Sequence, residues 1–149
     1  MKRFIGICLL SCTFVNPSMA DSSDNECANF HIQISNLTKM ACVLTSQRVI
    51  HGNLITPPPM SILPNDSKRF DMNQTIYGPA ITLSYQCGSE NISFTSQQNV
   101  CVLEAGDITG SILHPVPINI NARYAALSGS YFWQKSGSIN WSIITEMKD

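Results

Sequence analysis

The sequence predicts an all-β protein, a single antiparallel β-sandwich of about eight or nine short strands stabilised by two disulfides. Short segments of alternating apolar and polar residues recur at a spacing of roughly 8–12 residues, and Gly, Pro and Asn residues separate them. No long apolar repeat of helical period occurs. With 44% hydrophobic residues, the chain of 149 residues can bury one such core.

The first part of the domain predicts two strands. Over residues 30–35 apolar side chains alternate with polar ones, which is the pattern of a half-buried strand. Residues 36–39 provide turn-forming side chains, and residues 41–50 form a second apolar run. We interpret this run as a strand because β-branched residues continue it, although residues 37–44 also fit one face of a short helix.

Pro57, Pro58 and Pro59 mark a connection, because proline cannot donate a hydrogen bond to a central strand. The triplet predicts a rigid polyproline-like crossing or a sheet edge, and a docking site for a partner is the alternative. Residues 62–70 then predict a turn that leads into another strand.

Residues 81–96 predict the clearest hairpin in the chain. If a two-residue turn begins at Gly88, Leu83 lies opposite Phe94 and the apolar side chains share one face. Ser, Thr, Asn and Gln side chains share the other face, as expected for an antiparallel pair with one buried side. Cys87 then lies on the buried face.

The next part of the chain predicts shorter elements. Residues 100–103, 111–113 and 118–121 are expected to be strands, and residues 124–127 a single helical turn. Two prolines lie between the second and third of these segments, which places this part at a sheet edge.

Residues 131–143 predict a second hairpin with a two-residue turn. In this register Phe132 faces Trp141, whereas Tyr131 and Trp133 lie on a polar surface. In the alternative register the turn has three residues and Trp133 enters the core.

Residues 1–20 predict a signal peptide, with a basic start, a short apolar run and a small-residue cleavage site at Ala20. The alternative is a lipoprotein signal in which Cys12 is lipidated. Cleavage would leave a flexible leader at residues 21–28 and a β-sandwich domain at residues 29–149. The protein is therefore expected to be secreted, with periplasmic transit if the source is bacterial.

Four cysteines follow the predicted signal: Cys27, Cys42, Cys87 and Cys101. An even number in a short exported chain predicts two disulfides and no free thiol, and three pairings are open. Each disulfide would stabilise the fold by about 2–4 kcal/mol, mainly by restricting the unfolded chain. No Cys/His cluster has metal-ligand spacing, so neither a metal nor a cofactor is expected.

The charge balance argues against a nucleic-acid partner. Removal of Lys2 and Arg3 leaves seven of the nine basic residues, against ten acidic residues. This weakly acidic chain has no run of Lys and Arg, and a nucleic-acid interface would require a basic stripe.

The sequence does not predict an enzyme. His31, His51 and His114 have no Asp or Glu at catalytic spacing, and no G-x-S-x-G nucleophile motif occurs. The carboxylates are scattered, without the pairing that a glycosidase site requires. A hydrolase would need one of the histidines to acquire a carboxylate partner in the fold.

Aromatic residues are the candidates for ligand contact: Tyr131 and Trp133, with Tyr77 and Tyr124 as neighbours. Amphipathic rings suit the headgroup region of a membrane, where the ring is partly buried and its polar edge stays hydrated. The same rings would also suit stacking against a glycan.

Several motifs occur in a distinctive order: Asn36-Leu37-Thr38, His51-Gly52-Asn53-Leu54, Pro57-Pro58, Ile62-x-Pro64 followed by Phe70, and Gly78-Pro79-Ala80-Ile81-Thr82-Leu83-Ser84-Tyr85. This order resembles that of the aegerolysin-like family, over roughly residues 30–101 and the segment around Trp133 and Trp141. The resemblance implies a secreted β-sandwich that recognises membrane lipids, often sphingolipids, and in some members forms pores with a larger partner protein. The family's aromatic Y-W-D-C-P-W stretch has no match here, so the fold carries over further than the lipid specificity.

Three functions are consistent with these observations. The first is a secreted, non-enzymatic binding protein that recognises membrane lipids as aegerolysin-like proteins do. The second is a secreted module, an effector or inhibitor, that binds a partner protein through a sheet edge or the Pro-rich segment. The third is a carbohydrate-binding β-sandwich that stacks the same aromatic residues on a glycan.

Overall fold

The computed structural model describes residues 26–104 and 106–146, which form one short 3-10 helix and ten strands. In chain order these are η2 (Glu26–Ala28), β1 (Asn29–Asn36), β2 (Cys42–His51), β3 (Asn53–Leu54), β4 (Ser61–Ile62), β5 (Asp66–Asn73), β6 (Ala80–Cys87), β7 (Glu90–Gln98), β8 (Ile108–Ile112), β9 (Ile120–Leu127) and β10 (Gly137–Thr145). The predicted signal peptide at residues 1–20 and residues 21–25 of the predicted leader lie outside the described residues. The last three residues of that leader form η2.

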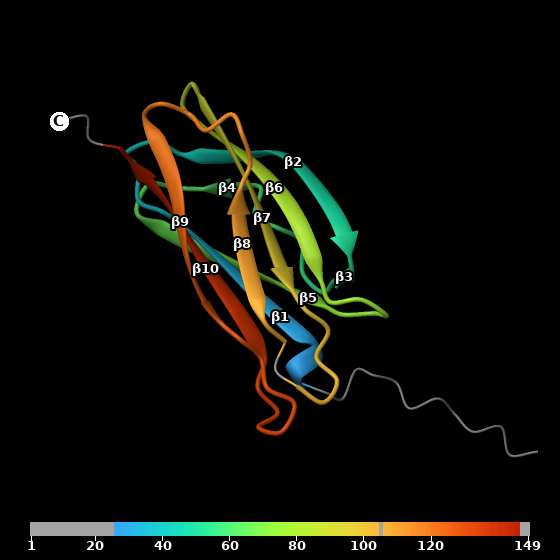
Figure 1. Cartoon of the computed structure of the whole chain (residues 1–149). Helices are drawn as coiled ribbons and strands as arrows, with labels where there is room; N and C mark the ends of the chain where they lie inside the picture. The colour runs from blue at the N-terminus through green and yellow to red at the C-terminus, as the bar shows by residue number, and fades with distance from the viewer. Residues whose placement is uncertain (1–25, 105, 147–149) are drawn as a thin grey trace, which may run out of the picture.

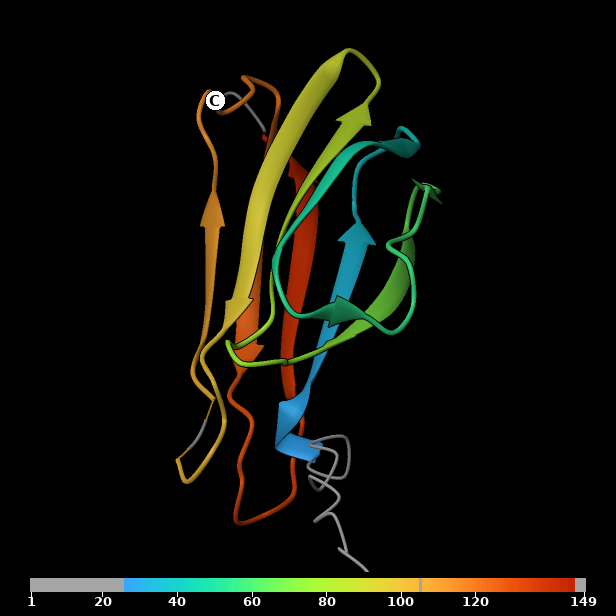
Figure 2. The same cartoon turned by 90° about the vertical axis from the view of Figure 1, so that its right-hand side faces the viewer.

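The strands form two five-stranded sheets that pack face to face (Figures 1 and 2). Sheet A has the order β3-β5-β1-β10-β9, and sheet B has the order β4-β2-β6-β7-β8. The predicted all-β sandwich with two disulfides is confirmed. One pair differs from the rest, because β1 and β10 are parallel while the other strand pairs are antiparallel.

The core lies between the sheets and centres on a row of aromatic rings. Phe94 of β7 stacks on Trp141 of β10 with ring centroids 4.4 Å apart, and on Tyr85 of β6 at 6.2 Å. The Trp141 indole donates a 2.8 Å hydrogen bond to the Ser96 hydroxyl, and the Tyr85 hydroxyl donates one of 2.9 Å to the Pro59 carbonyl. Burial raises the pKa of the Tyr85 phenol. Each polar ring atom in this row therefore has a partner.

Two of the predicted local patterns are confirmed. β6 and β7 form the hairpin with Leu83 opposite Phe94, and Gly88 in the turn has a φ of 63°, which glycine adopts without strain. Residues 42–51 form a strand and not a helix. Cys87 faces the core and forms a disulfide with Cys42 on the neighbouring strand β2.

Two predicted elements are wrong. Residues 100–103 form a loop instead of a strand, because Cys101 is bonded to Cys27 outside the sheets. Residues 124–127 are the end of β9 and not a helical turn, since β10 pairs with them along their length.

The prediction of a hairpin over residues 131–143 is wrong about the strand that pairs with residues 137–143. β10 pairs with β9, so Trp141 lies opposite Tyr124 instead of Phe132. Residues 128–136 are the connection between these strands. The alternating core side chains of β10 were identified correctly, but their partner is more distant in sequence.

The aromatic row generates a stability prediction. Phe94→Ala should lower the free energy of unfolding by about 3–5 kcal/mol, because it leaves a cavity between Tyr85 and Trp141. The matched variant is Thr95→Ala, on the outer face, whose hydroxyl contacts that of Thr82 at 3.0 Å. It should cost about 1 kcal/mol or less. Denaturant unfolding measures both, and equal losses would contradict the assignment of the two faces of β7.

Candidate functional site

Three loops meet at one end of the sandwich, which we call the loop end. Residues 74–79 connect β5 to β6, residues 99–107 connect β7 to β8, and residues 128–136 connect β9 to β10. The strand registers place these connections together, because the start of β6 pairs with the end of β7 and the start of β10 lies beside the start of β1. Figures 1 and 2 show the loops of residues 99–107 and 128–136 projecting together beside η2.

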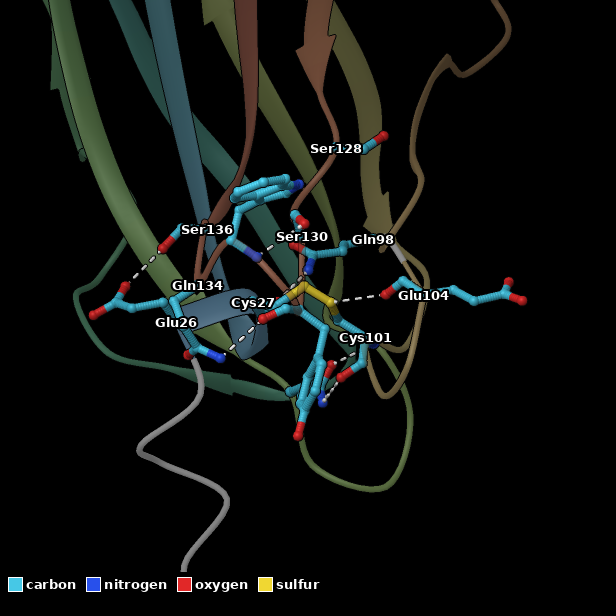
Figure 3. The surroundings of a disulfide bond; sticks show 12 residues. Glu26, Cys27, Gln98, Cys101, Glu104, Ser128, Ser130, Gln134 and Ser136 are labelled. Carbon is cyan, nitrogen blue, oxygen red and sulfur yellow. Dashed lines mark hydrogen bonds between the residues drawn. A yellow bond between two sulfur atoms is a disulfide. The ribbon is translucent and has the colours of Figure 1, made fainter.

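The Cys27–Cys101 disulfide joins η2 to the second of these loops across 74 residues of sequence (Figure 3). The first loop is attached to the same point. The Cys101 N–H donates a 3.1 Å hydrogen bond to Gln74 Oε1, and Gln74 Nε2 donates to the Cys101 carbonyl at 3.4 Å. A Cβ at Gly78 would collide with the backbone of Gln98, so the first two loops lie in close backbone contact.

The third loop packs against the same disulfide. A Cβ at Gly129 would lie 3.1 Å from Cys27 Sγ and 3.0 Å from the Lys135 carbonyl oxygen. At the end of this loop the Ser136 hydroxyl donates a 2.9 Å hydrogen bond to Glu26, which lowers the pKa of that carboxyl group. The disulfide, the Gln74 hydrogen bonds and the Ser136–Glu26 hydrogen bond together link η2 and all three loops.

A tight turn at the tip of the third loop exposes two aromatic side chains. Ser130 and Lys135 exchange backbone hydrogen bonds of 2.8 and 2.9 Å, which closes a four-residue turn between them. Phe132 and Trp133 lie in this turn with 76% and 84% of their surface exposed. Tyr131 is half-buried, and the edge of its ring meets Phe132 at a centroid distance of 5.7 Å.

Exposed apolar side chains occur on all three loops. Their exposed fractions range from 43% for Val100 to 84% for Trp133. The set, which we call the apolar tip, is Ile76, Tyr77, Val100, Val102, Leu103, Phe132 and Trp133. Exposed apolar residues also occur at the opposite end, but the two most exposed ones, Trp133 and Ile76, belong to this set, which makes it the candidate interaction surface.

The structure brings three of the four predicted contact residues to the loop end. Tyr131 and Trp133 share one turn, and Tyr77 lies on another loop, where its ring is 5.1 Å from that of His51. Tyr124 is elsewhere. It lies on β9, its ring is 5.0 Å from Trp141, and it covers Gly110 at the side of the sandwich.

Sequence reasoning missed the aliphatic members of the apolar tip and Phe132. A strand is predicted from the sequence at residues 100–103. All four of these residues are hydrophobic, so apolar and polar side chains do not alternate along them. That lack of alternation was the available signal, since a half-buried strand alternates. Ile76 lies in a short loop with Gly78 and Pro79, where no alternation or helical period indicates whether a side chain is buried or exposed.

The charge around the apolar tip is weakly acidic. η2 and the three loops carry the exposed residues Glu26, Glu104 and Asp107 against one basic residue, Lys135. No Lys/Arg cluster occurs here. This end of the sandwich therefore has no basic patch that would attract an anionic surface.

One histidine has a carboxylate partner that sequence spacing did not reveal. On the outer face of sheet A, His31 Nδ1 lies 2.7 Å from Asp71 Oδ1 and 2.7 Å from Arg69 Nη2. Burial raises the pKa of Asp71, but hydrogen bonds from Arg69 and His31 outweigh this effect and lower it. The hydrogen bonds of the His31 side chain join it to these two residues and to no hydroxyl nucleophile among the described residues. This arrangement indicates an ion-pair network on the surface of the sheet.

The described residues hold no group of three or more His, Cys, Asp and Glu side chains arranged to bind a metal ion. Within residues 26–104 and 106–146, no helix is long and apolar enough to cross a membrane.

Comparison with known proteins finds a likeness in fold alone. No protein-family model and no curated protein sequence matches the chain. The crystal structure of the lipid binding protein Nakanori superposes with a TM-score of 0.57 and 7% identity over 78% of this chain and 71% of that one. IP-1A from Alcaligenes faecalis gives a TM-score of 0.56 and 12% identity, over 85% and 97% of the two chains. The likeness supports the β-sandwich, and membership of the aegerolysin-like family stays a proposal.

The disulfide at the loop end generates a prediction about local order. Replacing Cys27 and Cys101 by Ser should lower stability by about 2–4 kcal/mol and increase proteolytic cleavage at residues 99–104, because those residues lose their anchor. Limited proteolysis of the folded protein with mass spectrometry measures this change.

The control is the Cys42→Ser/Cys87→Ser variant, which removes a cross-strand link within sheet B. Under conditions where both variants stay folded, this control should show cleavage at residues 99–104 at the parent rate. Equal acceleration in both variants would contradict a local role for the Cys27–Cys101 disulfide.

Proposed function

We propose that the protein is a secreted, non-enzymatic binding protein whose apolar tip contacts membrane lipids. The observation that carries this proposal is the exposure of seven large apolar side chains on three loops joined at one disulfide. The solved structure of a lipid binding protein with the same fold adds support. The two disulfides are consistent with an extracellular or periplasmic location, where such bonds persist.

The size of the apolar tip is sufficient for membrane association. Burial of one large apolar side chain contributes about 1.5–3 kcal/mol. A single myristoyl chain binds a bilayer with an association constant of about 10⁴ M⁻¹, or about 5.5 kcal/mol. Insertion of Phe132, Trp133 and Leu103 would reach that range before any contribution from the other residues.

The chemistry of the tip favours the interfacial region over the hydrocarbon centre. Trp133 and Tyr77 are amphipathic rings that suit the headgroup boundary. Glu104 and Lys135 are exposed beside them and would remain in water. Because no basic cluster is present, binding should persist at high salt and should not require anionic lipid.

Carbohydrate binding is the second candidate, and a pocket beside the tip favours it. The pocket has a volume of about 300 Å³, and the residues that line it include His51, Gln97 and Asn99 together with Tyr77 of the tip. An aromatic ring with nearby amide groups suits a sugar, which presents one apolar face and several hydroxyl groups.

Removal of two aromatic side chains tests membrane contact directly. Phe132→Ser/Trp133→Ser should weaken binding to lipid vesicles by about 100-fold or more, since it removes roughly 3–6 kcal/mol of apolar burial. Vesicle pelleting over a range of lipid compositions and salt concentrations measures this loss.

The matched control is Leu63→Ser/Ile118→Ser, which removes two side chains of 60% and 66% exposure. These residues lie at the opposite end of the sandwich, between β4 and β5 and between β8 and β9. The control should bind vesicles within about twofold of the parent. Failure of the parent to bind any vesicle, or equal loss in both variants, would refute the proposal, and binding on a glycan array would then favour the second candidate.

A further inference from the structure

One edge of β2 lacks a partner over most of its length. On one side β2 pairs with β6, while on the other it pairs with β4 only at Cys42 and Val43. The Leu44 N–H then donates a 2.9 Å hydrogen bond to the Met60 carbonyl. From residue 45 to residue 51, the described part of the chain provides no further backbone partner on that side. Such an edge is a template for an added strand.

The Pro-rich segment explains why this edge stays free. Residues 57–60 run beside the start of the free edge, and the Tyr85 hydroxyl fixes them by its hydrogen bond to the Pro59 carbonyl. Pro57, Pro58 and Pro59 have no N–H to offer to β2, so this segment cannot extend the sheet. An open pocket of about 360 Å³ lies between the start of the free edge and the Pro-rich segment.

Apolar residues line part of this pocket next to the free edge of β2. The pocket is lined by Leu44, Thr45, Ser46, Gln47, Pro57, Pro58 and Met60. Leu44 is partly buried and packs on the core, and Pro58 is buried. One apolar side chain of a strand paired with β2 would enter this space.

Two irregularities limit the length of an added strand. The register of β2 on β6 shifts between Leu44 and Ser46 and again between Val49 and His51. Residues 46–49 are regular between them. At about 3.3 Å per residue, such a segment accepts a short strand and prevents longer edge-to-edge growth.

Charge identifies the kind of partner. Arg48 is the one Lys, Arg, Asp or Glu residue between Cys42 and Asn65, and its side chain is exposed. No salt bridge joins Arg48 to another described residue. A second copy of β2 would bring another arginine and no acidic residue, so self-pairing leaves this charge without a counterion.

We propose that residues 46–49 of β2 bind an extended segment of a partner protein by strand addition. The segment carries an acidic residue near Arg48 and an apolar side chain for the pocket between β2 and the Pro-rich segment. Residues 46–49 share no residue with the apolar tip, although β2 ends at His51, whose ring contacts Tyr77 of the tip at 5.1 Å. The inference does not depend on lipid binding.

The test uses three synthetic nine-residue peptides, in each of which a five-residue strand of Val and Thr alternating around a central residue is flanked at both ends by Gly and Ser. The central residue is Glu in the first and Lys in the second, and the third repeats the Glu peptide with the backbone nitrogens of all five strand residues methylated, which removes the donors from both edges of the strand. Fluorescence anisotropy should give binding of the Glu peptide about fivefold tighter than the Lys peptide. The methylated peptide should not bind, because it cannot form the strand ladder.

Two protein variants complete the test. Arg48→Glu should reverse the preference between the Glu and Lys peptides. Phe132→Ser/Trp133→Ser should have the same affinity as the parent for the Glu and Lys peptides and, like the parent, should not bind the methylated one. Amide hydrogen exchange should show peptide-dependent protection within β2. Absence of binding, equal binding of the methylated peptide, an unchanged preference in Arg48→Glu, or protection of β2 by self-association would each overturn the proposal.

Discussion

The candidate site depends on the Cys27–Cys101 disulfide, which fixes η2 and three loops at one end of the sandwich. Apolar side chains on independent loops would lower their exposed area by collapsing onto one another. Here the disulfide, the Gln74 hydrogen bonds to Cys101 and the contact of Gly129 with Cys27 prevent that collapse. The cost of ordering these loops is met during folding, so a ligand that bound the apolar tip would not incur it again.

The same sandwich presents two surfaces of different chemistry. The apolar tip is formed by side chains and would bind through apolar burial, with little dependence on charge. The β2 edge is formed by backbone groups, with Arg48 as its one charge, and would bind through a strand ladder. Both surfaces arise where the regular sheets end, at loops in one case and at an edge left open by proline in the other.

Local patterns in the sequence predicted the parts of the fold that local interactions determine. The alternation in residues 30–35 and the turn at Gly88 identified β1 and the β6–β7 hairpin, because period and turn chemistry are properties of short segments. The parallel pairing of β1 with β10 has no local signal. Phe132 was placed in the core because its neighbours alternate by chance, and only the long-range pairing of Trp141 with Tyr124 excludes that register. The register that exposes Trp133 agrees with the structure, whereas the neighbouring apolar side chains on the other loops had no local signal in the sequence.

Amide hydrogen exchange with and without vesicles tests most directly the claim that three loops form one membrane-binding surface. We expect vesicles to protect residues 74–78, 99–104 and 131–135 together, while residues 116–119 at the opposite end exchange as they do in solution. Because the disulfide and the hydrogen bonds around it link the loops, the three segments should gain protection at the same lipid concentration. Protection of one loop alone, or of the opposite end, would contradict the central claim.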